Sequence, residues 1–130
     1  MISRNLTLVP PLPKRRAIEH RAAELAMMFI DLDDLLTKKK GSAALTPQAR
    51  LLLGLLIHRS MTVKEALMYT PLSYRAFYVM MTKLKALTLI QVDGSAHDRR
   101  IRKLTLGRRF NPIIKQLAAH RETLAEKVGV

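Results

Sequence analysis

Two short amphipathic helices followed directly by two strand-like runs constrain the fold of this chain most. Residues 62–69 begin with Thr62 as a helix N-cap and Glu65 three residues later, which is the spacing of a capping box. Residues 73–87 begin with Ser73, a second good N-cap. Two helices joined by so brief a turn predict a helix-turn-helix.

The helix over residues 73–87 has two distinct faces when it is traced at 100° per residue. Its apolar stripe, which we expect to be buried, consists of Phe77, Met80, Met81, Leu84 and Leu87. The opposite face carries Arg75, Tyr78, Val79 and Thr82, spaced i, i+3, i+4 and i+7. Arginine can pair with guanine, threonine with a base or a phosphate, tyrosine with a phosphate, and valine with a thymine methyl group. The alternative is that these residues are the solvated face of an ordinary core helix.

A basic hairpin is expected after this helix. Residues 89–92 and 101–106 are strand-like, and a segment rich in positive charge joins them. Asp93-Gly94 is a turn signal, so we expect the two runs to pair. The hairpin would form a wing over residues 91–103.

Four segments occur in a recognisable order: L-T-P-Q-A-R-L-L-L at 45–53, T-V-K-E-A-L at 62–67, L-S-Y-R at 72–75 and D-R-R at 98–100. They resemble the MarR family of bacterial winged-helix regulators over about residues 43–110. The resemblance implies a mainly α (α+β) winged helix-turn-helix that binds double-stranded DNA. It also implies that Asp98 braces the wing and that Arg99, Arg100 or both reach toward the minor groove.

The same resemblance places Ser73, Tyr74 and Arg75 at the opening of a recognition helix that enters the major groove. The expected DNA contacts are Ser73, Tyr74, Arg75, Tyr78, Val79, Thr82, Lys83, His97, Arg99, Arg100, Arg102 and Lys103. Two departures from the family pattern stand out. Thr88 replaces the glycine that usually precedes the first wing strand, so the helix must end without the residue that most easily adopts positive φ. The C-terminal part is also short, with one helix where a longer helical pair is common.

Residues 46–58 form the expected centre of the winged domain. Thr46 is an N-cap with Pro47 at the first helical position, and the helix is apolar almost all round. Gly54 indicates a close helix crossing.

Long amphipathic helices are expected at both ends of the chain. The first runs over residues 14–38 with the apolar stripe Ile18, Ala22, Leu25, Met28, Phe29, Leu32, Leu35 and Leu36. Residues 38–40 are lysines that either contact phosphate or form a solvated helix end, and Gly41 suits the cap. Asn111-Pro112 repeats the cap-plus-proline signal and opens a helix to about residue 128.

We expect these terminal helices to pack together and against a second copy of the chain, giving a two-fold dimer. The expected interface consists of Ile18, Leu25, Phe29, Leu32, Ile113, Ile114, Leu117 and Leu124. The alternative is that the two helices satisfy each other within a monomer. The predicted organisation is an extended arm at 1–13, a dimerisation helix at 14–42, the winged domain at 43–110 and a C-terminal dimerisation helix at 111–130.

The formal net charge of +13 favours a polyanionic partner. Residues 43–110 hold twelve lysines and arginines against three acidic residues, so the excess coincides with the winged domain. An architectural chromosome protein, a plasmid replication or partition factor, and an RNA-binding winged helix share this balance. Few aromatic residues and no tryptophan disfavour a single-strand binder. We expect double-stranded DNA and a homodimer partner.

No catalytic, metal or cofactor site is expected. The four histidines, His20, His58, His97 and His120, are scattered, and there is no cysteine. No signal sequence or membrane-spanning run is recognisable, so we expect a cytoplasmic, nucleoid-bound protein. A small-molecule effector is common in relatives, but no pocket for one can be identified in this sequence.

Overall fold

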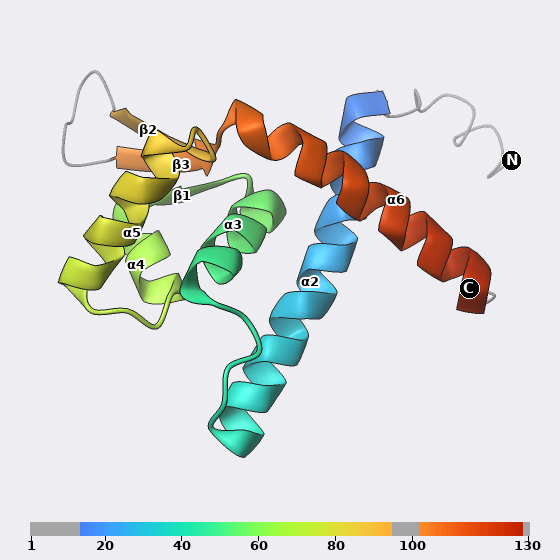
Figure 1. Ribbon diagram of the computed structural model, residues 1–130, viewed down its shortest axis with the longest axis horizontal. Coiled ribbons are helices and arrows are strands. Elements are labelled where there is room, and N and C mark those ends of the chain that lie inside the picture. Colours follow the sequence, from blue (N-terminus) through green and yellow to red (C-terminus); the bar gives the residue numbers. More distant parts are fainter. Residues whose placement is uncertain (1–13, 95–101, 129–130) are drawn as a thin grey trace, which may run out of the picture.

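The computed structural model describes residues 14–94 and 102–128. The elements follow one another as α2 (Lys14–Lys40), α3 (Pro47–His58), β1 (Ser60–Thr62), α4 (Val63–Tyr69), α5 (Tyr74–Ala86), β2 (Ile90–Gly94), β3 (Arg102–Leu106), η1 (Arg108–Phe110) and α6 (Asn111–Val128). In Figure 1, α3, α4, α5 and the small sheet form one body, and α2 and α6 cross each other beside it. The predicted winged helix-turn-helix is confirmed. No helix of the described residues is long and apolar enough to cross a membrane.

The sheet is antiparallel with the order β1-β3-β2. Strand β1 was not predicted, because three residues are too few for a recognisable pattern. Asp93 and Gly94 do not form the expected turn: they lie in β2, opposite Lys103 and Arg102. Gly94 lacks the positive φ that a two-residue hairpin turn requires, so β2 continues through it. The connection at 95–101 lies outside the described residues.

Three helices begin at the predicted caps. Thr46 Oγ1 accepts a hydrogen bond from the Ala49 amide at 3.2 Å, and Thr62 and Glu65 form the complete capping box. Ser73 Oγ accepts from the Ala76 amide at 3.2 Å. Each bond satisfies an amide that the first turn of a helix leaves without a partner.

The cap predicted at Asn111 is wrong. Its φ of −56° and ψ of −43° are helical, and the 3₁₀ turn Arg108–Phe110 precedes it directly. Because the chain enters α6 from this turn, Asn111 continues a helical path instead of capping it.

The core of the winged body lies between α3, α5 and the sheet. Its fully buried side chains include Leu51, Leu55, Phe77, Ile90 and Leu104. A Cβ at Gly54 would collide with the Tyr69 ring and the Met61 side chain, so the glycine makes room for these side chains and not for the backbone of a crossing helix. Leu87 was wrongly assigned to the buried stripe of α5, because it is the C-cap and is 52% exposed.

Thr88 ends α5 in the left-handed region with φ of 59°. Its amide donates to the Lys85 carbonyl and the Leu89 amide donates to the Leu84 carbonyl, which together make a Schellman motif. A threonine therefore occupies a left-handed position that favours glycine. Gly107 packs so closely on the Thr88 carbonyl that a Cβ there would clash with it.

Helices α2 and α6 pack against each other within one chain. Ala22 and Ala26 of α2 and Ala118 of α6 are buried in a second core together with Phe110 and Ile114. Small side chains allow the two helices to approach closely where they cross in Figure 1. The expectation that the terminal helices pack together is confirmed.

The buried side of α2 is rotated from the predicted stripe. Its buried residues are Ala22, Leu25, Ala26, Ile30 and Asp33, whereas Met28, Phe29, Leu32 and Leu35 are exposed. This side packs on α6 and α3 through Ala22 and Ala26, and nearer its end it includes Asp33, whose carboxylate faces the α2–α3 connection. An apolar face therefore remains uncovered on α2.

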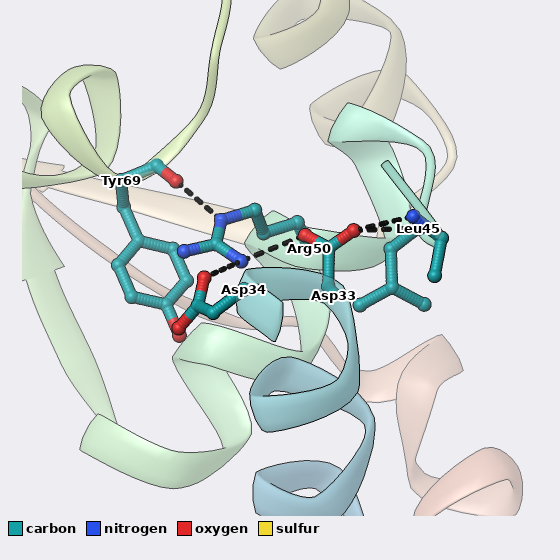
Figure 2. A network of polar contacts seen from close by, with 6 residues as sticks. Asp33, Asp34, Leu45, Arg50 and Tyr69 are labelled. Atoms are coloured by element: carbon teal, nitrogen blue, oxygen red, sulfur yellow. Dashed lines mark hydrogen bonds and ion pairs between the residues drawn. The ribbon is translucent and has the colours of Figure 1, made fainter. Parts of the chain in front are cut away.

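Asp33 joins α2 to the winged body through Arg50 of α3 (Figure 2). Asp33 Oδ1 accepts from the amides of Ala44 at 2.7 Å and Leu45 at 2.9 Å, and Oδ2 accepts from Arg50 Nη1 at 2.8 Å. Arg50 Nε donates to the Tyr69 carbonyl at 2.7 Å, and its guanidinium lies 4.7 Å from the centre of the Tyr69 ring. One arginine thus links α2 and α3 to the end of α4.

Burial alone would raise the pKa of Asp33. The hydrogen bonds from the Leu45 and Ala44 amides and from Arg50 outweigh that effect, and the pKa is lowered. Because the folded pKa lies below the unfolded one, the ionised carboxylate contributes stability above the ordinary aspartate pKa. That contribution is lost as the pH falls through the lowered value.

The two aspartates beside Arg50 provide a matched test of this network. Asp33→Ala leaves the Ala44 and Leu45 amides without their acceptor and removes the buried one of the two carboxylates that Arg50 contacts, so the free energy of unfolding should fall by about 3 kcal/mol. Asp34→Ala removes a partner 3.0 Å from the same Arg50 nitrogen, but the Asp34 side chain is 58% exposed. Its loss should cost at most about 1 kcal/mol. Urea denaturation followed by circular dichroism measures both; equal losses would contradict the role given to Asp33.

Thr88→Gly should stabilise the protein. A left-handed conformation costs an L-residue about 1–2 kcal/mol, and glycine avoids this cost. The greater conformational freedom of glycine in the unfolded chain reduces the gain in stability by about 0.5–1 kcal/mol. We therefore expect a net gain of roughly 0.5–1 kcal/mol in thermal or urea unfolding. Thr88→Ala is the control, because alanine retains a Cβ at the same φ. An equal gain from both variants would show that backbone strain is not the cause.

Candidate nucleic-acid interface

Helix α5 is anchored on one side and open on the other. Phe77, Met80, Met81 and Leu84 are buried against α3, α4 and the sheet. The outward side carries Tyr74, Arg75, Tyr78, Val79, Thr82 and Lys83, which together line an open hollow of about 570 Å³. We call these six residues the outer face of α5. The sequence-based separation of the two faces agrees with this geometry, while the role of the outer face remains a prediction.

Two tyrosines dominate the first turns of the outer face. The rings of Tyr74 and Tyr78 lie 4.8 Å apart between centroids, and their hydroxyls share a hydrogen bond of 3.3 Å. That hydrogen bond, followed by burial and the charge that Tyr74 would carry, raises the pKa of Tyr78. Tyr78 therefore stays neutral near pH 7, and both tyrosines present apolar rings with hydroxyl tips.

The rest of the outer face combines an apolar, a hydroxyl and two cationic side chains. Val79 is 55% exposed, and Arg75 and Lys83 are exposed beside it. Thr82 Oγ1 donates to the Tyr78 carbonyl at 2.8 Å, so its single hydroxyl proton is used within the helix. Such a surface can bind phosphate, donate hydrogen bonds from its cations to the guanine acceptors, and cover methyl groups.

The strand β3 carries two exposed cations, Arg102 and Lys103, whose side chains point to opposite faces of the sheet. The positive charge of Arg102 has a small influence on the Tyr78 hydroxyl. Lys103 acts instead on Glu65, whose pKa is lowered mainly by hydrogen bonds from the Thr62 amide and side chain. The structure therefore separates these two predicted DNA contacts. The remaining wing residues of the prediction, His97, Asp98, Arg99 and Arg100, lie outside the described residues.

The predicted dimer residues divide into two groups. Within one chain Leu25 and Ile114 are each only 7% exposed, and Ile18 and Leu117 are partly buried against the second core, so these four already have partners. The exposed members are Phe29, Leu32, Ile113 and Leu124. Only this second group offers substantial apolar area to another molecule.

Sequence reasoning missed Asp33 and Arg50, which fix how the candidate interface sits relative to α2. A signal for them existed. Asp33 follows Ala26 and Ile30 at helical spacing, and Arg50 is the one arginine in the otherwise apolar helix Pro47–His58. Opposite charges on two apolar faces indicate a buried pair.

The histidines and acidic residues do not gather into a metal site in the part of the chain that the structure describes. Within residues 14–94 and 102–128, no group of three histidine, aspartate or glutamate side chains is placed to hold a metal ion. His20 lies 3.3 Å from Glu24 in the exposed part of α2, and His58 contacts the Tyr69 ring edge-on. Neither histidine borders the outer face of α5.

The fold is similar to those of two solved regulators. A MarR family transcriptional regulator from Silicibacter pomeroyi DSS matches with a TM-score of 0.50 and 22% sequence identity, over 79% of this chain and 68% of the other. The transcriptional regulator Tm0710 from Thermotoga maritima matches with a TM-score of 0.56 and 17% identity, over 81% of this chain and 72% of the other. No protein-family model and no curated protein matches the chain. The likeness shows that this chain has the winged-helix fold of MarR-type regulators.

Proposed function

We propose that this protein is a sequence-specific regulator of transcription that binds double-stranded DNA as a homodimer. Helix α5 enters the major groove, and the wing at residues 91–103 lies at the minor groove or the backbone. The observation that carries the proposal is the outer face of α5, a row of exposed cationic, aromatic and aliphatic side chains on a helix whose other side is locked into the core. The fold similarity to two transcriptional regulators supports it.

The shape and charge of the outer face fit the major groove. That groove is about 12 Å wide, which admits one α-helix with its side chains. Ser73 caps the N-terminus of α5, and the helix dipole there favours a phosphate. Arg75, Lys83 and Arg102 supply positive charge around the apolar centre of the face. Arg75 is the residue that we assign to guanine, through its two-pronged guanidinium.

The homodimer rests on the apolar side chains that α2 and α6 leave exposed. Met28, Phe29, Leu32 and Leu35 follow one side of α2, and Ile113 and Leu124 are exposed on α6. Exposed apolar area of this extent on paired helices is typical of an interface. A two-fold dimer would present its two α5 helices about 34 Å apart, so the target would be a pseudo-palindrome.

We assign residues 14–42 and 111–130 to dimerisation and 43–110 to DNA binding. Within one chain the two parts are joined by the contacts of Asp33 with Arg50 and by the second core. This arrangement lets a change in α2 alter the spacing of the two recognition helices.

An architectural protein with little sequence preference is the second candidate. The excess of positive charge over residues 43–110 favours it, because phosphate contacts alone give tight binding at low salt. Exposed Arg108 and Arg109 after β3 are part of this charge and lie outside α5. The two candidates differ in whether α5 distinguishes one base sequence from another.

Arg75→Ala should reduce discrimination between a preferred duplex and a scrambled duplex by about 1–3 kcal/mol. The side chain is exposed, so the fold should be retained. Fluorescence anisotropy with both duplexes at one fixed salt concentration gives the ratio of dissociation constants. Lys115→Ala, which removes an exposed positive charge from α6, is the control and should leave the ratio unchanged. An unchanged ratio in Arg75→Ala would show that Arg75 does not distinguish one base sequence from another.

A double substitution, Phe29→Glu with Leu32→Glu, should convert a dimer to a monomer. Both side chains are exposed in the single chain, so carboxylates there are tolerated in the monomer but cannot be buried against a second copy. Sedimentation velocity reports the mass, and circular dichroism checks that the helices are kept. Ala119→Glu with Thr123→Glu, two exposed positions on α6 that face away from Ile113 and Leu124, is the control for added charge. A dimer that persists in the first variant would contradict this interface.

A further inference from the structure

The recognition segment lacks the side chains that read adenine and cytosine best. Residues 73–87 contain no asparagine, glutamine, aspartate or glutamate. Adenine is read by the paired donor and acceptor of a side-chain amide, and cytosine by a carboxylate that accepts from its amino group. Hydrogen bonding from α5 to base edges therefore depends on cations and hydroxyls, which favour guanine.

The centre of the outer face is apolar. Tyr74 is 65% exposed and Val79 is 55% exposed, and the Tyr78 ring packs against that of Tyr74. The hydroxyls of Tyr74 and Tyr78 bond to each other, and the Thr82 hydroxyl proton is used on the Tyr78 carbonyl. These polar atoms are thus partly satisfied inside the helix, which leaves carbon surface turned outward.

We propose that α5 recognises the C5-methyl groups of thymine through Tyr74, Tyr78 and Val79. This inference rests on the proposed DNA-binding function and specifies its ligand as a thymine-bearing major groove. The thymine methyl group is the only apolar group on the major-groove edge of the four bases. Arg75 and Lys83 line the same hollow as the apolar centre, so its surroundings are positively charged and complement the DNA backbone.

The size of the effect follows from the burial of a methyl group. One methyl group buried against carbon is worth about a fourfold change in affinity. A symmetric dimer that buries one such group in each half-site would gain about 15-fold by the same reasoning. Replacing thymine by uracil removes only this methyl group and keeps the hydrogen-bonding edge.

The test is a competition between two random duplex pools, one made with thymidine and the other with deoxyuridine. Each pool has its own primers and is re-amplified with its own nucleotide between rounds of selection on the full-length protein. We expect the thymine pool to be retained at least fourfold better after several rounds. Equal retention of both pools would overturn this inference and leave DNA binding intact. Retention of neither pool would overturn the proposed function as well.

Substitutions on the outer face assign the preference to these residues. Tyr74→Ala and Val79→Ala should each bring the retention ratio of the two pools close to one while DNA is still bound. Both side chains are exposed, so the fold should be retained, and circular dichroism checks this. Met68→Ala is the matched control, because Met68 is 79% exposed but lines a separate hollow together with Asp33 and Thr37. A thymine preference that survives both outer-face substitutions would overturn the assignment.

Discussion

The carboxylate of Asp33 is the constraint on which the arrangement of the two parts of this molecule depends. It accepts from two loop amides and from Arg50, and Arg50 in turn holds the carbonyl and the ring of Tyr69 at the end of α4 (Figure 2). A buried carboxylate is costly unless all its acceptor sites are used, so the network has one favourable geometry. The direction of α2 relative to the helix-turn-helix is fixed by that geometry.

In the same fold, one side of α5 is buried in the core and the other side is exposed. Phe77, Met80, Met81 and Leu84 are committed to the core, while Ser73 caps one end and Thr88 closes the other in a left-handed conformation. Apart from the partly buried Tyr78, the outer face consequently makes no contact with the core in the described residues, and the helix that carries it is anchored on its other side. A rigid helix that presents unburied tyrosine, valine and arginine loses little conformational freedom when it binds, which favours recognition of one sequence over another.

Local signals in the sequence were sufficient for the helix starts at Thr46, Thr62 and Ser73 and for the two faces of α5, because caps and helical periodicity act over a few residues. Contacts distant in sequence were not predictable in this way. The strand β1 exists only because β3 pairs with it, and the buried side of α2 includes Asp33, which pairs with Arg50 17 residues further along the chain. The Asp-Gly pair was misread because its turn preference is weaker than the pairing of β2 with β3. The DNA contacts and the dimer interface remain predictions.

Selection of binding sites from random duplex DNA at two salt concentrations tests the central claim most directly. A dimeric regulator that reads bases through α5 should recover a two-fold symmetric motif, and the preference for that motif should persist at the higher salt concentration because base contacts do not depend on counterion release. If no motif emerges and affinity collapses steeply as salt rises, the protein binds DNA through phosphate contacts alone, and the account of a sequence-specific regulator is wrong.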